Sequence, residues 1–178
     1  KLYGTNTDAY GFAQNIKESA KDWRFEDGKA VVLGAGGAAN AIVYALLEEN
    51  VPQIIITNRS RNKAEALRTM NTDKITVVDW EDRNSTFQDS NLIVNTTALG
   101  MSGKPALEVD ISAAPKSALV TDIVYAPLMT DLLSSADAFG MQTITGIGML
   151  LHQARPGFEL WNGVLPDVTE NLEAIVLK

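Results

Sequence analysis

The sequence predicts an α/β fold in which an open, mostly parallel sheet carries helices on both faces. Short apolar runs rich in valine and isoleucine alternate with longer segments of helical periodicity, at the spacing typical of strand–helix–strand units. The first of these runs leads directly into a glycine-rich turn at Gly34 to Gly37, and a helical segment follows. Together these observations indicate a three-layer, doubly wound fold of Rossmann type, with its ligand at the carboxyl ends of the strands.

The first half of the chain is predicted to alternate helices with strands. Cap-type residues at Asn6 to Asp8 and apolar residues at every fourth position predict the first helix. The later strands are short apolar runs, and Pro52 marks where the second helix has already ended. In order, the elements are a helix at 8–20, a strand at 30–33, a helix at 38–49, a strand at 53–57, a helix at 63–70 and a strand at 75–78.

The second half continues the alternation. Pro156 and Gly157 predict a kink or break in the long amphipathic segment, and Asp167 is the expected cap of the last helix. The predicted elements are strands at 92–95 and 118–124, a helix at 129–138, an edge strand at 141–144, a helical stretch at 146–161 and a helix at 167–177.

The glycine-rich turn has the residue types that a dinucleotide pyrophosphate needs. Gly34 makes the turn, Gly36 lets the phosphates approach the backbone, and the small Ala39 lets the helix pack against its strand. A tight structural turn without a ligand is the alternative. The residues expected to contact the pyrophosphate are Gly34, Ala35, Gly36, Gly37 and Ala38.

The segment after the second strand distinguishes between two cofactors. An acidic residue at this point would bind the ribose 2′-hydroxyl of NAD, but the segment 58–63 contains no acid. It contains Asn58, Arg59, Ser60 and Lys63, and a guanidinium fork suits phosphate oxygens, so these residues predict binding of the 2′-phosphate of NADP. A solvated run of charge at the start of a helix is the alternative.

Composition limits the remaining possibilities. With 178 residues and 46% hydrophobic content, the chain is expected to form one domain over 1–178. The net charge of −7 argues against nucleic acid or an anionic membrane as a partner. The absence of cysteine excludes disulfides and thiolate zinc sites, fits a cytoplasmic location, and leaves no metal site to expect. No apolar run approaches the roughly 18 residues that a membrane span needs.

Several segments, in one consistent order over almost the whole chain, resemble the shikimate dehydrogenase family. The glycine turn and the basic segment at 58–63 belong to this set. The other matching segments are Gly4-Thr-Asn-Thr-Asp8 through Phe12, Asn95-Thr-Thr-Ala-Leu-Gly-Met101, Asp122-Ile-Val-Tyr125-Ala-Pro127 with Thr130 and Leu132, Gly146-Ile-Gly-Met-Leu150 with Gln153, and Trp161-Asn-Gly-Val-Leu-Pro-Asp167.

The resemblance implies NADP-dependent interconversion of shikimate and 3-dehydroshikimate, a step in aromatic amino-acid biosynthesis. In the family, an aspartate and a lysine together hold the substrate hydroxyl and assist its proton transfer. Asp8 matches that aspartate, which makes it the expected catalytic residue; a simple helix cap is the alternative.

The same resemblance assigns further site residues. Tyr125 and Gln153 are expected with Asp8 at the substrate, and each has an ordinary alternative as a core aromatic or a solvent-facing helix residue. The family motifs place further residues along the cofactor, although core packing is the favoured alternative for the methionine, and the polar pair at the strand end could equally begin a turn. These expected cofactor contacts are Ile123, Gly146 and Met149 at the nicotinamide, and Asn95 and Thr96 at the ribose.

The family's catalytic lysine and its serine-rich carboxylate site lie in an N-terminal domain, whereas this chain begins only seven residues before Asp8. The resemblance therefore implies the cofactor domain of a two-domain enzyme, which alone binds NADP and is inactive. The segments 1–22 and 146–178 are expected to adjoin the N-terminal substrate domain. Phe158, Leu160 and Trp161 are accordingly expected to be exposed in this chain.

Two other functions stay open at this point. One is a relative that acts on quinate or aminoshikimate, and the other is a stand-alone NADP-binding regulatory module. The oligomeric state is not predicted. The single histidine, His152, is expected to be a surface or packing residue without a catalytic role.

Overall fold

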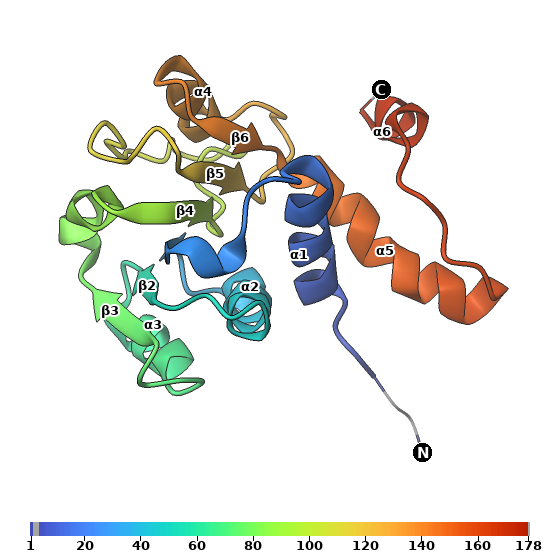
Figure 1. Ribbon diagram of the computed structural model, residues 1–178, viewed down its shortest axis with the longest axis horizontal. Coiled ribbons are helices and arrows are strands. Elements are labelled where there is room, and N and C mark those ends of the chain that lie inside the picture. Colours follow the sequence, from blue (N-terminus) through green and yellow to red (C-terminus); the bar gives the residue numbers. More distant parts are fainter. Residues whose placement is uncertain (2–3, 178) are drawn as a thin grey trace.

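A sheet of six parallel strands in the order β3-β2-β1-β4-β5-β6 forms the centre of the protein (Figure 1). The computed structural model describes residue 1 and residues 4–177. The strands are β1 (Lys29–Leu33), β2 (Ile54–Thr57), β3 (Ile75–Val78), β4 (Ser90–Asn95), β5 (Leu119–Asp122) and β6 (Gln142–Ile144). This order changes direction between β1 and β4, as in a Rossmann-like fold, so the predicted fold class is confirmed.

Over the described part of the chain, six α-helices and two 3₁₀ helices precede, connect or follow the strands. They are α1 (Asp8–Ser19), η1 (Phe25–Asp27), α2 (Gly37–Glu48), α3 (Arg61–Arg68), η2 (Trp80–Phe87), α4 (Asp131–Ala138), α5 (Gly146–Asn162) and α6 (Glu170–Val176). Within residues 4–177, none of these helices has the length and hydropathy needed to cross a bilayer.

The sheet is buried because its strands are apolar on both faces. Along β1, Ala30 and Val32 join a core cluster with α1, α2, α3 and the start of α5. Val31 and Leu33 point to the opposite face and join a second cluster with η2, α4 and the segment 107–114. A strand with both faces covered needs the near-continuous hydrophobic run from which it was predicted.

Several predicted features differ from the structure: β4 begins and β5 ends two residues before the prediction, and α4 begins two residues after it. The last helix begins at Glu170, because the Thr169 hydroxyl and not Asp167 accepts the capping hydrogen bond, from Leu172 N at 3.2 Å. The helix after β2 begins at Arg61, two residues before the prediction. Helix α5 also continues through Pro156 without a break, although proline removes a backbone donor and crowds the carbonyl four residues before it.

Helices α1 and α5 pack in close contact, and glycines make this contact possible. A Cβ added to Gly11 would lie 2.7 Å from the carbonyl oxygen of Met149, and one added to Gly148 would overlap the Asn15 side chain. The buried Asn15 amide donates to the carbonyl of Thr145, the residue that caps α5, at 3.0 Å. This packing fixes the start of α1 relative to the first turns of α5.

A buried polar cluster lies in the same interface. The Arg155 guanidinium contacts Glu18 Oε1 at 3.2 Å and His152 Nδ1 at 3.2 Å, and its Nε donates to the carbonyl of Pro166 at 2.6 Å. Arginine only donates, so His152 Nδ1 accepts and the Nε2 proton faces Glu18 Oε2 at 3.6 Å. His152 is therefore a buried packing residue, one of the two roles expected for it.

The burial of His152 predicts a stability that depends on pH. Burial lowers the pKa of the imidazole, Glu18 partly opposes this, and Arg155 adds to it. The folded state therefore binds the imidazole proton less well than the unfolded chain does. The stabilising contribution of neutral His152 is complete above about pH 6.5 and is lost as the pH falls. Urea unfolding between about pH 7.5 and 5.5 measures the loss, and His152→Gln is expected to flatten the profile. Since the sequence has a single histidine, an imidazole proton resonance that titrates above pH 6.5 would contradict the prediction.

Candidate functional site

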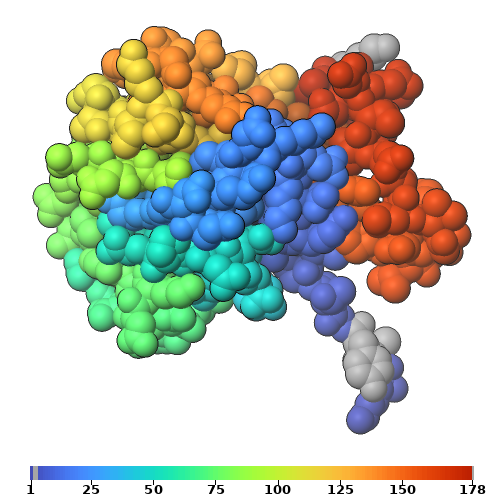
Figure 2. Space-filling model, in the orientation of Figure 1, coloured from blue at the N-terminus to red at the C-terminus, as the bar shows by residue number. Residues whose placement is uncertain are grey.

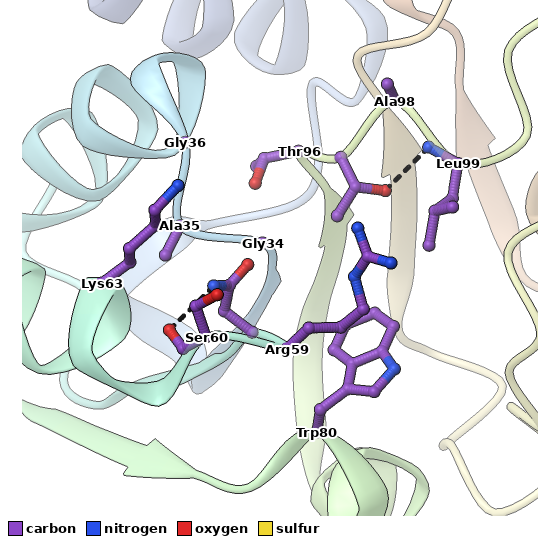
Figure 3. A pocket seen from close by; sticks show the side chains of 12 residues that line it. Gly34, Ala35, Gly36, Arg59, Ser60, Lys63, Trp80, Thr96, Ala98 and Leu99 are labelled. Carbon is purple, nitrogen blue, oxygen red and sulfur yellow. Dashed lines mark hydrogen bonds between the residues drawn. The ribbon is translucent and has the colours of Figure 1, made fainter. Parts of the chain in front are cut away.

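The first cavity lies at the carboxyl ends of the central strands and has a volume of about 300 Å³ (Figure 3). The loops after β1, β2, β3 and β4 form its walls. Eight of its lining residues were expected from the sequence, namely Gly34, Ala35, Gly36, Asn58, Arg59, Ser60, Lys63 and Thr96. The other four are Trp80, Thr97, Ala98 and Leu99.

The glycine turn fits a ligand phosphate. Gly34 has φ of 111°, and an added Cβ would lie 2.6 Å from the Thr96 hydroxyl oxygen, so this glycine is required by the fold itself. Gly36 caps α2 in an extended conformation, and among the described residues no atom lies within 4 Å of its added Cβ. The space beside Gly36 is thus open to a ligand, next to backbone N–H groups at a helix N-terminus, which attract anions.

The cations after β2 differ in their partners. Arg61 donates to Asp79 at 2.6 Å and to Glu65 at 3.1 Å, and Asp79 raises the pKa of its guanidinium. Arg59 and Lys63 line the cavity and have no ion pair with any other described residue. Figure 3 shows Lys63 beside the Gly36 end of the cavity and the Arg59 guanidinium at the opposite end. Positive charge that the protein does not neutralise therefore faces the cavity.

A second cavity of about 180 Å³ contains the residues expected at the nicotinamide and the substrate. It brings together the first turn of α1, the start of α2, the loop after β5 and the first turns of α5. Its lining residues are Asp8, Ala38, Ile123, Tyr125, Gly146, Met149, Leu150 and Gln153. Segments far apart in the sequence thus meet at this cavity.

Asp8 is the first residue of α1 rather than its cap. Thr7 occupies the cap position, and its side chain makes no capping hydrogen bond. The half-buried Asp8 carboxylate accepts from the Asn6 amide at 3.4 Å, and the Asp8 backbone N–H donates to Asn6 Oδ1 at 2.7 Å. Asp8 lines the second cavity, and its carboxylate oxygens can accept further hydrogen bonds besides the one from Asn6.

The other residues of the second cavity differ in exposure. Tyr125 is 46% exposed, so it is not a core aromatic, whereas Met149 is 8% exposed and also belongs to the core. Gly146 lets α5 start against the end of β5, because an added Cβ would lie 2.5 Å from the carbonyl oxygen of Ile123. Tyr125 and Gln153 are therefore the side chains that a ligand could displace or contact, and Gly146 sets the shape of the wall.

Asn95 does not line either cavity. It is fully buried at the end of β4, where its amide donates to Asp122 Oδ1 at 3.0 Å and its Oδ1 accepts from the Thr97 hydroxyl at 2.7 Å. Asp122 also accepts from Thr130 Oγ1 at 2.8 Å and from Val124 N at 2.9 Å. Burial raises the pKa of the Asp122 carboxyl, and these three donors oppose that shift. This network joins the loops that line the two cavities.

Sequence reasoning missed four residues of the first cavity. Trp80 directly follows β3, so the general rule that ligands bind at the carboxyl ends of parallel strands would have indicated it. Thr97, Ala98 and Leu99 follow the expected Thr96 in the loop after β4, and the same rule applies to them.

Comparison with known proteins agrees with this geometry. Residues 14–124 match the family model described as shikimate/quinate 5-dehydrogenase, and residues 146–175 match that of the shikimate 5′-dehydrogenase C-terminal domain. Among curated relatives, the protein named shikimate dehydrogenase (NADP(+)) from Dinoroseobacter shibae is 50% identical over 176 residues, which are 99% of this chain and 63% of the relative. The one from Rhodospirillum rubrum is 49% identical over 181 residues. The chain thus spans less than two thirds of the length of these relatives.

Two solved structures are similar over nearly the whole chain. Quinate dehydrogenase from Corynebacterium glutamicum, solved with NAD, has a TM-score of 0.89 and 32% identity, covering 98% of this chain and 62% of that one. Shikimate 5-dehydrogenase from Thermus thermophilus, solved with NADP(H) and shikimate, has a TM-score of 0.78 and 35% identity, covering 94% and 60%. Because the family model matches more than half of the residues of this chain, the chain belongs to the shikimate/quinate 5-dehydrogenase family.

Proposed function

We propose that this chain binds NADP(H) across the two cavities and forms the cofactor-binding part of a shikimate dehydrogenase. One observation carries the proposal: the start of α2 borders both cavities, with Gly36 in the first and Ala38 in the second. A dinucleotide whose pyrophosphate lies at this helix N-terminus has its two nucleoside halves in different cavities. Calorimetric titration tests the proposal, and NADP is expected to bind more tightly than NAD.

Each group of residues then has a distinct task. The backbone at Gly34 to Gly37 binds the pyrophosphate, and Arg59, Ser60 and Lys63, with Asn58, bind the 2′-phosphate. Asn58 also shapes its own loop, since its amide donates to the Ser60 carbonyl at 2.9 Å. Thr96 is held beside the ribose, because its hydroxyl donates to the Leu33 carbonyl at 2.8 Å. Asn95 acts behind this wall, through its contacts with Thr97 and Asp122.

In the second cavity, Ile123, Gly146 and Met149 form the surface against which the nicotinamide lies. The bound cofactor supplies hydride acceptance and donation. Asp8 holds the substrate hydroxyl and shares its proton, while Gln153 and Tyr125 orient the substrate. These assignments follow the family motifs, and the common cavity of all six residues supports them.

We propose further that this chain alone does not complete the reaction. In shikimate dehydrogenases the matching aspartate works with a lysine, and none of the described residues that line this cavity is a lysine. The chain is therefore expected to bind NADP without oxidising shikimate. Adding the substrate domain of a curated relative is the experiment that tests for restored turnover, and turnover by the chain alone would contradict the proposal.

The same proposal assigns a surface to the substrate domain. The end of α5, α6 and the loop between them stand out from the body of the molecule (Figures 1 and 2). Leu160 and Trp161 are 78% and 86% exposed, and Phe158 is 45% exposed, as predicted from the sequence. We propose that segments 1–22 and 146–178 pack against that domain there; positions 2, 3 and 178 lie outside the described residues. A blue shift of Trp161 emission on adding the domain is expected, and Trp161→Phe is its control.

Quinate is the second candidate substrate, because the quinate dehydrogenase from Corynebacterium glutamicum is among the similar structures. That structure contains NAD, whereas the segment after β2 in this chain has exposed cations and no acidic residue between Asn58 and Lys63. The charge of this segment favours NADP, and with it shikimate as named for the curated NADP-dependent relatives. Comparing shikimate with quinate turnover in the reconstituted enzyme decides between them.

Replacing Arg59 tests the cofactor preference directly. Arg59→Ala is expected to weaken NADP binding by about 1–3 kcal/mol and to change NAD binding little, because a charge-assisted hydrogen bond to the 2′-phosphate is lost. Arg61→Ala is the matched control, since Asp79 and Glu65 already engage that guanidinium outside the cavity. Equal losses for both cofactors in Arg59→Ala would show that the residue is structural.

A further inference from the structure

The first cavity has an aromatic wall that the proposed function does not use. Trp80 begins η2 directly after β3, is half-buried, and lines the cavity with Leu99 and Ala98. Part of the indole packs against the second core cluster, and part faces the cavity. Trp80 therefore both packs against the core and presents surface to a ligand in the cavity.

Arg83 holds this indole in a fixed position. Its guanidinium carbon lies 4.6 Å from the centroid of the Trp80 ring, in a cation–π contact. The same guanidinium donates to the Trp80 carbonyl at 2.7 Å and to the Glu108 carbonyl at 2.6 and 3.2 Å. Arg83 does not itself line the cavity. The indole is thus clamped from one side, and its remaining surface is presented to the cavity.

The position of Trp80 matches one part of the dinucleotide. Figure 3 shows Trp80 and Leu99 at the end of the cavity away from Gly36 and Lys63, with the Arg59 guanidinium beside them. The flat, apolar surface of Trp80 and Leu99 suits a planar base, and the Arg59 guanidinium beside it suits the 2′-phosphate, which is carried by the same ribose as the base. The adenine ring is the planar group of NADP that belongs on the same side of the pyrophosphate as the 2′-phosphate.

Building on the proposed function, we propose that Trp80 is an adenine-binding residue and that Arg83 is the residue that positions it. The indole would bind the base through its face or edge, and this contact would be the same for NADP and NAD. Trp80 thus contributes affinity for the nucleotide, while Arg59 contributes the preference for the 2′-phosphate.

Tryptophan fluorescence with 2′,5′-ADP as the ligand tests this proposal, because that probe contains adenine and the 2′-phosphate but no nicotinamide. The sequence has three tryptophans, so Trp23→Phe and Trp161→Phe provide matched controls. We expect saturable quenching in the wild type and in both controls, and its loss in Trp80→Phe. Trp80→Leu is expected to raise the Kd for 2′,5′-ADP, NADP and NAD alike by about tenfold or more.

Arg83→Lys separates positioning from charge. It keeps the positive charge but loses the planar group that makes three hydrogen bonds, so a several-fold rise in the Kd for 2′,5′-ADP reports loss of the clamp. Thermal unfolding of each variant shows whether the fold is intact, and the affinity for nicotinamide mononucleotide is expected to stay unchanged. Proportional losses for nicotinamide mononucleotide and 2′,5′-ADP would overturn the assignment in favour of a structural role.

The outcomes also separate this proposal from the proposed function. If the wild type binds 2′,5′-ADP, but quenching survives in Trp80→Phe and the Kd is unchanged in Trp80→Leu, then adenine lies elsewhere and NADP binding still stands. If the wild-type protein binds neither 2′,5′-ADP nor NADP, the proposed function fails, and the adenine site fails with it.

Discussion

Replacing Gly36 by valine is expected to abolish detectable binding of both NADP and NAD while the protein stays folded. The backbone of Gly36 is extended, which any residue adopts, and an added Cβ would meet no described atom within 4 Å. The valine side chain would instead occupy the space through which the pyrophosphate reaches the backbone. Calorimetry with each cofactor, together with thermal unfolding, measures the two effects separately.

Gly34→Ala is the contrasting control for this experiment. With φ of 111° and Thr96 only 2.6 Å from the added Cβ, alanine at this position strains the turn itself. We expect Gly34→Ala to lower the unfolding temperature and Gly36→Val to leave it nearly unchanged. A large drop in the unfolding temperature of Gly36→Val would mean that its loss of binding reflects the fold and not the space for phosphate.

The second large effect is expected for Asp122→Ala, which should lower the free energy of unfolding by about 3–5 kcal/mol. Removing this carboxylate leaves the Asn95 amide, the Thr130 hydroxyl and the Val124 N–H without their buried acceptor. Each buried donor left without a partner costs about 1–3 kcal/mol. Urea unfolding measures the change in free energy. In a protein of this size, the unfolding temperature should also fall by roughly 10 °C.

Asp122→Asn is the conservative control for that network. Its amide oxygen still accepts one hydrogen bond, and the Thr130 hydroxyl can rotate to accept from the new amide group, so the loss should be clearly smaller than for alanine. If Asp122→Ala unfolds within about 1 kcal/mol of the wild type, the network does not hold the two loops together.

The sequence was sufficient to locate the strands because the central ones contain short apolar runs, although Thr76 interrupts β3 and β6 begins with Gln142 and Thr143. It was sufficient for much of the cavity walls because ligand-binding loops follow such strands. Helix boundaries were less predictable. Asp167 and Thr169 are both cap-type residues, and only the packed chain decides which side chain reaches a free N–H group. The continuation of α5 through Pro156 could not be predicted either, because the local sequence does not reveal that this helix packs against α1.

The candidate site divides in the same way. Residues next to strand ends, such as Arg59 and Tyr125, were found because position along the chain fixes where they lie. The buried position of Asn95 could not be predicted in this way, because it depends on the register that pairs Asn95 with Asp122 across β4 and β5. Register between parallel strands is set by tertiary packing, so an amide that the family motif places at the cofactor stands behind the cavity wall.

The glycine contacts between α1 and α5 have a mechanical consequence. Because backbone meets side chain and backbone at Gly11 and Gly148 with no room to spare, neither helix can slide along the other without collision. Asp8 and Gln153, one on each helix, are therefore held at a fixed spacing. Gly146 and Met149 lie on α5 as well, so the side chains proposed to hold the substrate and the surface proposed for the nicotinamide form one rigid unit.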